Sequence, residues 1–155
     1  MPNDIPRDGL APRFWETTPL DEMSRDEWEA LCDGCGKCCL NKLEDEDGNV
    51  ALTRVACKLF DGKSCLCSNY GHRHKYVPEC IVMTPETIVK NHYWLPQTCA
   101  YRLLFEGRPL YDWHPLISGR AETVHQAGVS AIRITVSEVD IDEDDWEDFI
   151  IEEPL

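Results

Sequence analysis

The pattern of apolar and polar positions divides the chain into three parts. Residues 1–12 contain three prolines and few apolar side chains, and packing residues begin at Phe14 and Trp15. We therefore expect residues 1–12 to form a flexible N-terminal arm and residues 13–137 to form a cysteine-rich, metal-binding domain. Residues 138–155 hold ten acidic residues and no Lys or Arg, so we expect them to form an acidic C-terminal tail.

A capping box predicts the first helix of the domain. Ser24 and Glu27 have the spacing of its two members, and Met23 and Trp28 occupy the positions of a hydrophobic staple. These residues predict a helix over 25–32 that leads directly into the first cysteine of the chain. The glycines that follow are typical of a helix end.

The other predicted elements are short and are marked by prolines, glycines and alternation. Thr-Pro pairs predict helix starts at Thr18 and over residues 85–93, the second helix being stopped by Pro96. A further helical stretch is expected from Thr98 to Gly107. The remaining predictions are a polar loop over 41–49 with a hairpin turn at Asp47-Gly48, a strand over 50–56, a turn at Asp61-Gly62, an ordered loop over 111–119 and a half-buried strand over 131–137.

Short helices mixed with a few short strands predict a small, loop-rich α+β fold, a single domain arranged around a cysteine metal cluster. The length of 155 residues fits one domain with a modest core. No run of about 18 apolar residues is present, which excludes a membrane-spanning helix. The first residues lack the apolar segment of a secretory signal, so we expect a cytoplasmic location, where thiols stay free or bind metal.

The charge distribution bears on possible partners. The net charge of −14 argues against nucleic-acid binding, because phosphate contact requires a basic face. In the tail, Trp146, Phe149 and Ile150 are spaced along one face of a helix, and Ile141 is a further apolar residue. We expect the tail to be extended or weakly helical when free. We also expect this face to dock on a protein partner or on a groove of the domain.

Cysteines are the strongest chemical signal in the sequence. Four of the nine lie within Cys32-Asp33-Gly34-Cys35-Gly36-Lys37-Cys38-Cys39, and the others are Cys57, Cys65, Cys67, Cys80 and Cys99. Exposed thiols in this density oxidise and cross-link. Gly34 and Gly36 can adopt positive φ, which lets backbone N–H groups face the sulfurs. We therefore predict a metal-binding loop, with the basic residues over 32–75 compensating thiolate charge.

The cysteine pattern leaves the metal open, since thiolates suit both zinc and iron–sulfur clusters. Paired Cys-x2–4-Cys units are typical of structural zinc sites. Cys32, Cys35 and Cys38 also match the first three ligands of a bacterial ferredoxin run, but Lys42 stands where the fourth would be. A remote cysteine would then be the fourth ligand. Adjacent Cys38 and Cys39 should point in different directions, so we expect one of them to serve another site or to pack in the core.

Catalytic residues are not identified by any signature. A nucleophilic cysteine needs a histidine placed beside it, and the five histidines follow no such pattern. His114, between Trp113 and Pro115, has the strongest reason for a special role. The residues leave open whether His114 or Cys65 is a metal ligand.

Several sequence motifs, in order along the chain, resemble those of a known protein family. The cysteine run, Cys57, Cys67-Ser-Asn-Tyr70-x-x-Arg73 and Cys80 resemble the bacterial CxxCxxCC cysteine-cluster family of zinc- or iron-chelating proteins. Trp94-Leu-Pro-Gln-Thr-Cys99-Ala-Tyr-Arg102, Trp113-His-Pro-Leu-Ile-Ser-Gly119 and the acidic tail resemble its YcgN-like branch. The resemblance implies a cytoplasmic bacterial protein of undefined physiological role. It implies these metal ligands: Cys32, Cys35, Cys38, Cys39, Cys57, Cys67, Cys80 and Cys99.

We therefore expect a metal-binding protein, with zinc slightly ahead of iron, in which the metal is structural and contributes folding free energy. One alternative is an iron–sulfur redox protein or enzyme. Some larger relatives join the cluster to methyl transfer on protein lysines, although no methyl-donor site is visible in this sequence. The other alternative is an adaptor that docks a protein partner through the acidic tail.

Overall fold

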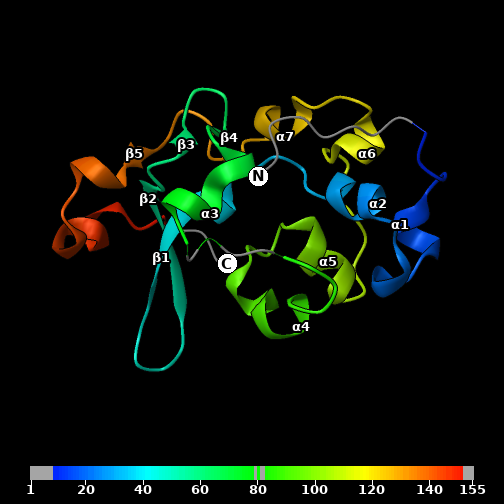
Figure 1. The fold of residues 1–155 in the computed structure, drawn as a ribbon, viewed down its shortest axis with the longest axis horizontal. Coiled ribbons are helices and arrows are strands. Elements are labelled where there is room, and N and C mark those ends of the chain that lie inside the picture. The colour runs from blue at the N-terminus through cyan, green and yellow to red at the C-terminus, as the bar shows by residue number, and fades with distance from the viewer. Residues whose placement is uncertain (1–8, 79, 81–82, 152–155) are drawn as a thin grey trace.

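The computed structural model describes residues 9–78, 80 and 83–151 (Figure 1). The α-helices are α1 (Phe14–Thr17), α2 (Arg25–Ala30), α3 (Arg73–Tyr76), α4 (Ile88–Asn91), α5 (Ala100–Phe105), α6 (Pro115–Ser118) and α7 (Thr123–Gln126). The 3₁₀ helices are η1 (Leu20–Glu22), η2 (Lys37–Cys39), η3 (Tyr70–His72), η4 (His92–Trp94), η5 (Glu138–Asp140) and η6 (Glu143–Phe149). The strands are β1 (Leu40–Glu44), β2 (Val50–Ala56), β3 (Phe60–Asp61), β4 (Leu66–Cys67) and β5 (Val136–Ser137).

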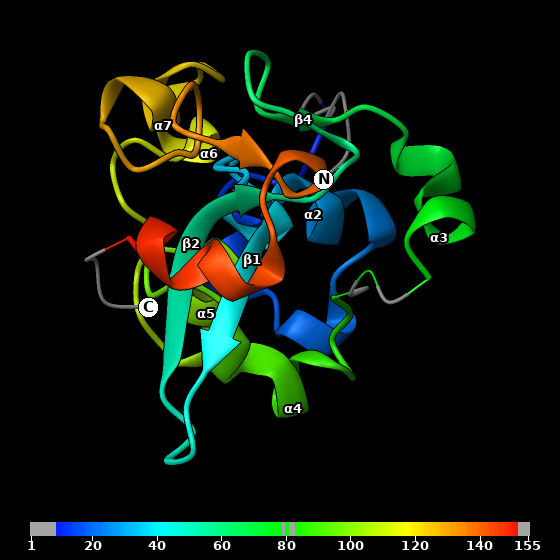
Figure 2. The ribbon, with the colours of Figure 1, turned by 90° about the vertical axis from the view of Figure 1, so that its left-hand side faces the viewer.

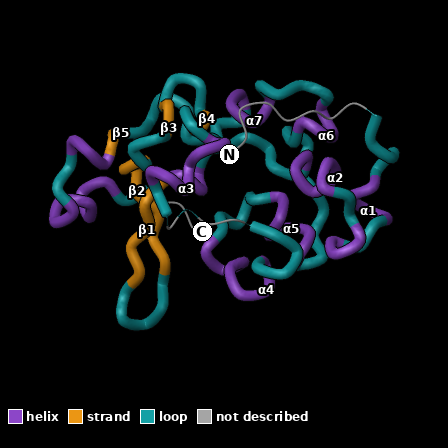
Figure 3. Tube along the Cα trace, viewed as in Figure 1, coloured by secondary structure: helices purple, strands orange, loops and turns teal. Residues whose placement is uncertain are grey.

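Short helices and a few short strands joined by long loops confirm the predicted α+β class (Figure 3). Over the described ranges, none of the helices has the length and apolar character needed to span a bilayer. The expected N-terminal arm falls largely outside those ranges.

Helices and strands occupy different sides of the molecule, and each side has its own hydrophobic cluster. Figure 1 shows α1, α2, α4, α5 and α6 together on one side and the β1–β2 hairpin on the other. The helical cluster consists of buried Phe14, Trp28, Ala30, Leu31 and Ile88. The sheet cluster consists of buried Leu40, Leu52, Ala56, Cys65 and Ala131. Both clusters are small, so groups lying between the two sides matter for holding them together.

The capping box at the start of α2 is confirmed. The Ser24 hydroxyl accepts from the Glu27 N–H at 3.1 Å, and the Glu27 carboxylate accepts from the Ser24 N–H at 2.9 Å. Helix α5 docks on α2 through Tyr101, whose hydroxyl donates to the Trp28 carbonyl at 2.7 Å while the two rings lie 4.7 Å apart. These contacts bring the end of α2 and the start of α5 to the same place.

The main sheet has the strand order β1-β2-β5. Strands β1 and β2 form an antiparallel hairpin, and β5 pairs in parallel with the end of β2. The hairpin turn is confirmed: the Asp45 carboxylate accepts from the N–H groups of Asp47 and Asn49, and Gly48 has φ of 83°. Strands β3 and β4 form a separate two-stranded ribbon.

The strand predicted over 131–137 forms only at Val136–Ser137, so most of that prediction is wrong. The backbone N–H groups of the segment are used elsewhere, since Ala131 donates to the Cys35 carbonyl at 2.7 Å. Arg133 has φ of 61°, which is incompatible with an extended strand. Of its apolar side chains, Ala131 and Ile132 pack in the sheet cluster, whereas Ile134 is exposed.

Two segments predicted as loops contain regular structure. Residues 41–44 belong to β1, because they pair with β2 despite their polarity. The segment 111–119 contains α6, with Pro115 at the first helical position and the His114 side chain accepting from the Leu116 N–H at 3.0 Å. Pairing with β2 thus stabilises the first segment, whereas a local cap and Pro115 start the helix in the second.

Predicted helix starts at the Thr-Pro pairs have mixed outcomes. Pro19, not Thr18, occupies the N-cap position of η1, and no side chain caps it. The helix predicted over 85–93 forms as α4 followed by η4. Its predicted start is wrong, because α4 begins at Ile88 with Thr87 as its N-cap, and the Thr84 hydroxyl instead accepts from the Thr87 N–H at 3.1 Å in the turn before the helix.

The described part of the acidic tail, residues 138–151, lies against the sheet. Ile150 forms an antiparallel bridge with Thr53, and the Ile151 N–H donates to the Leu52 carbonyl at 2.7 Å. Figure 2 shows this segment crossing in front of β1 and β2. These residues therefore pair with β2 of the domain itself, and the division of the chain at residue 138 stays a prediction.

Replacing Ile151 with Ala should lower the free energy of unfolding by about 1–2 kcal/mol, because its half-buried side chain packs against the sheet cluster. The matched control is Val139→Ala, at a tail residue that is 70% exposed, where we expect a change below about 0.5 kcal/mol. Urea unfolding of both variants measures the difference. Equal midpoints would show that the tail does not contribute to the stability of the sheet.

Candidate metal centre

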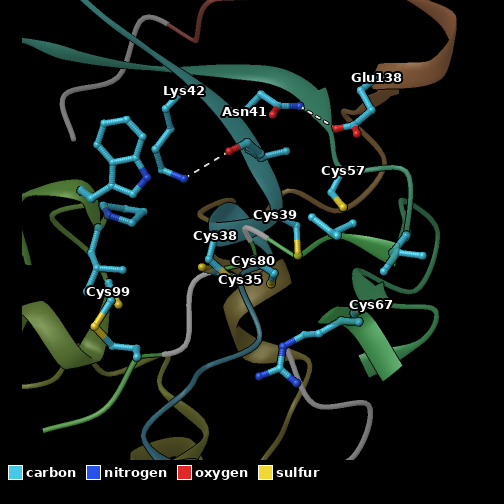
Figure 4. A pocket seen from close by; sticks show the side chains of 18 of the residues that line it. Cys35, Cys38, Cys39, Asn41, Lys42, Cys57, Cys67, Cys80, Cys99 and Glu138 are labelled. Carbon is cyan, nitrogen blue, oxygen red and sulfur yellow. Dashed lines mark hydrogen bonds between the residues drawn. The ribbon is translucent and has the colours of Figure 1, made fainter. Parts of the chain in front are cut away.

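A single cavity gathers the cysteines that the sequence assigns as ligands. Its volume is about 1350 Å³, and its lining includes Cys32, Cys35, Cys38, Cys39, Cys57, Cys67, Cys80 and Cys99 (Figure 4). The walls come from both sides of the molecule, with Trp28 and Tyr101 from the helices and Leu40 from the sheet. All nine cysteines of the chain are free thiols in the structure.

The loop between α2 and η2 places the first cysteines at the cavity. Gly34 and Gly36 have φ of 82° and 76°, which confirms the predicted left-handed turns. Asp33 stabilises the same loop, because its carboxylate accepts from the Cys35 N–H at 3.0 Å. Cys38 then follows within η2. The importance of Asp33 was not predicted, although Asp before Gly is a common turn signal.

Backbone pairing places the cysteines of the sheet side. The Cys57 N–H donates to the Cys39 carbonyl at 2.8 Å, directly beyond the pairing of β1 with β2. The Phe60 N–H donates to the Cys57 carbonyl at 2.9 Å, and Phe60 is paired with Cys67 in the small ribbon. Cys39, Cys57 and Cys67 are therefore held together by main-chain hydrogen bonds.

The last two cysteines come from the ends of helical segments. Cys80 follows α3, and its N–H donates to the Val77 carbonyl at 3.1 Å while its own carbonyl accepts from the His74 ring at 3.0 Å. Cys99 is the N-cap residue of α5. The packing of α5 on α2 through Tyr101 brings Cys99 to the cavity.

Burial keeps most of these sulfurs protonated. It raises the pKa of Cys99 to about 12, and it raises the pKa of Cys32 and Cys35 above the usual thiol range. Cys38 differs, because a hydrogen bond from the Cys39 thiol lowers its pKa to about 6 and raises that of Cys39. The thiolate is the form that binds metal, and Cys38 is the cavity cysteine whose pKa is lowered.

The donor set fits a thiophilic metal ion, although the sulfurs surround the cavity without converging on one point. Across residues 9–78, 80 and 83–151, no three Cys, His, Asp or Glu side chains stand close enough to hold a metal ion as they are. Metal binding must therefore turn cysteine side chains toward a common centre. The lining also includes carboxylates such as Glu138, but the eight thiols are soft donors of the kind that suits zinc or iron.

Lys42 supplies positive charge beside the sulfurs. Its ammonium group donates to the Leu40 carbonyl at 3.1 Å and lies 5.8 Å from the ring centroid of Trp94. Burial lowers the pKa of Lys42, while nearby thiolates, Cys38 first among them, act in the opposite direction. Lys42 is therefore the residue best placed for the predicted compensation of thiolate charge, and Figure 4 shows it at the edge of the cavity.

Cys65 lies outside the cavity, and its thiol contacts the loop between α2 and η2. It is fully buried, and its thiol is 3.3 Å from the Cys35 carbonyl and 3.6 Å from the Gly34 carbonyl. Burial raises the pKa of Cys65 to about 11. This thiol is therefore placed as a hydrogen-bond donor to the loop.

His114 is also absent from the cavity lining, and both of its ring nitrogens are used. Nδ1 accepts from the Leu116 N–H at 3.0 Å, so Nε2 carries the proton that it donates to the Leu31 carbonyl at 2.7 Å. Its special role is to fix the residue before Cys32. This buried contact links α6 to the start of the cysteine loop.

Comparisons with known proteins agree with this site. Residues 31–100 match the CxxCxxCC family, described as a "putative zinc- or iron-chelating domain". A UPF0260 protein of Rhodobacter capsulatus is 61% identical, over 93% of this chain and 97% of that protein. UPF0260 proteins of Allorhizobium ampelinum and Rhizobium etli are 57% and 53% identical, over 92% and 99% of this chain and 89% and 92% of theirs. No solved structure matches the chain.

Replacing Gly36 with Ala should destabilise the protein more than replacing Gly48 with Ala. Both glycines have positive φ, so each substitution carries a backbone cost of about 1–2 kcal/mol. A Cβ at Gly36 would also lie 2.6 Å from the Cys65 sulfur and 2.9 Å from the Phe60 ring, whereas one at Gly48 meets nothing within 4 Å. We expect an additional loss of about 1–3 kcal/mol at Gly36 in urea unfolding. Equal losses would contradict the close packing of the cysteine loop on Cys65.

Proposed function

The chain belongs to the family of UPF0260 proteins and matches the CxxCxxCC domain over residues 31–100, and we propose that its eight cavity cysteines bind metal that holds the fold together. One observation carries this proposal: thiols from separate segments between Cys32 and Cys99 face one cavity. Each segment is held there by its own backbone contacts. A metal bound by these thiols would cross-link the helical side to the sheet side.

We propose zinc as the metal. Closed sites with four thiolates are typical of structural zinc, and the two hydrophobic clusters are small enough for such a cross-link to matter. Free thiols throughout the chain also support a reducing, cytoplasmic location, in which these ligands remain available.

A second candidate is an iron–sulfur protein with a redox or enzymatic role. Its support is the run Cys32, Cys35 and Cys38 together with Cys99, because packing of α5 on α2 supplies the remote fourth thiol that the sequence run lacks. The absorption spectrum of protein purified without oxygen distinguishes the candidates. Protein that holds zinc is colourless, whereas iron–sulfur clusters absorb at about 400 nm.

Removing the metal should lower the melting temperature of the whole domain, because its ligands join segments far apart in the chain. The measurement is thermal unfolding of reduced protein before and after treatment with a chelator, with metal content determined in both samples. Restoring the zinc should restore the melting temperature. A melting curve unchanged after verified metal loss would show that the metal is not structural.

Replacing Cys35 with Ser should remove at least one bound metal per chain, because Cys35 lies in the cavity and in both Cys-x-x-Cys steps of the loop. Cys65→Ser is the matched control, since Cys65 is 30 residues away in sequence, contacts the same loop and lies outside the cavity. It should keep the full metal content while losing some stability. Loss of metal in Cys65→Ser, or full metal in Cys35→Ser, would overturn the assignment.

A further inference from the structure

The cavity cysteines fall into two groups according to the elements that carry them. The helix-side group is Cys32, Cys35, Cys38 and Cys99. Cys32 follows α2 and Cys99 caps α5, and the two helices are joined by the 2.7 Å hydrogen bond from Tyr101 to the Trp28 carbonyl. Cys35 and Cys38 lie on the loop that leaves α2.

Electrostatic interactions among the sulfurs agree with this grouping. Cys38 interacts with Cys32, Cys35 and Cys99, and Cys35 interacts with Cys99. Cys38 is thus the member that interacts with each of the other three.

The sheet-side group is Cys39, Cys57, Cys67 and Cys80. Cys57 is joined to Cys39 by the 2.8 Å backbone hydrogen bond and to the β3–β4 ribbon through Phe60. The sulfur of Cys57 interacts with those of Cys39, Cys67 and Cys80. Cys80, on the segment after α3, is assigned to this group by that interaction with Cys57. Figure 4 shows Cys57 and Cys67 at the end of the cavity opposite Cys99.

The seam between the groups is the adjacent pair Cys38 and Cys39. Both lie in η2, where neighbouring side chains project about 120° apart. One side chain can therefore serve each group, while their thiols still contact each other. Lys42 lies beside this seam, because its ammonium group donates to the carbonyl of Leu40, the residue that follows Cys39.

We propose that the cavity holds two metal centres, each bound by four thiolates, one formed by the helix-side group and one by the sheet-side group. This inference rests on the proposed function and adds its stoichiometry and its division of ligands. A divalent ion bound by four thiolates leaves a centre with a net charge of −2, and the thiols that are still protonated release their protons on binding. The Lys42 ammonium at the seam offsets part of that charge for both centres.

The wild-type protein allows a direct test that does not depend on any variant folding. The full chain is reduced, stripped of metal and loaded with ¹¹³Cd²⁺, a thiophilic probe visible by NMR. Two bound equivalents and two resonances in the four-thiolate region are expected. One equivalent, or one resonance at saturation, would overturn the two centres and leave metal binding intact. No bound cadmium would overturn the proposed function itself.

Paired substitutions test the division of ligands. In the helix-side pair Cys32→Ser/Cys99→Ser, both changes fall in one group, so one cadmium ion should remain per chain. The sheet-side pair Cys57→Ser/Cys67→Ser should likewise keep one, and the cross-group pair Cys99→Ser/Cys67→Ser should keep none. Circular dichroism of each variant establishes that it is folded. Loss of both ions in a same-group pair that remains folded, or retention in the cross-group pair, would show that the ligands are divided differently.

Discussion

The gathering of eight thiols into one cavity is the constraint on which the rest of this structure depends. The cavity lies between a helical cluster and a sheet cluster, each with five buried residues among those that the structure describes. Without metal, burial keeps most of the thiols neutral, and neutral thiols form only weak hydrogen bonds across such a space. Metal–thiolate bonds would replace this weak contact with a cross-link between the two sides.

Several residues that do not line the cavity hold its first cysteines in place. His114 fixes the carbonyl before Cys32, and Cys65 donates to the carbonyls of the loop that follows. Ala131 donates to the Cys35 carbonyl from a third direction. The cysteine loop has little regular structure of its own, so contacts from distant segments determine its course. This explains why a buried histidine and a buried cysteine near a metal site need not be ligands.

The acidic tail illustrates how charge and packing can act on different faces of one segment. Its carboxylates remain largely exposed, while Ile150 and Ile151 follow the edge of β2. Glu138 also accepts from the Asn41 side chain at 3.1 Å, close to Cys57. Negative charge near a thiolate site disfavours further anionic ligands, so the cavity is suited to cations.

The sequence by itself determined the features that depend on neighbours a few residues apart. The capping box of α2, the positive φ of Gly34 and Gly36 and the β1–β2 turn all arise from local hydrogen bonds and backbone sterics. The resemblance of the cysteine pattern also identified the eight sulfurs that line the cavity. Only the tertiary structure decided which of them are neighbours and that His114 and Cys65 are supports. It also decided that residues 131–135 are not a strand. Those outcomes depend on contacts between segments far apart in sequence, such as Tyr101 on Trp28 and Ala131 on Cys35, which no local pattern encodes.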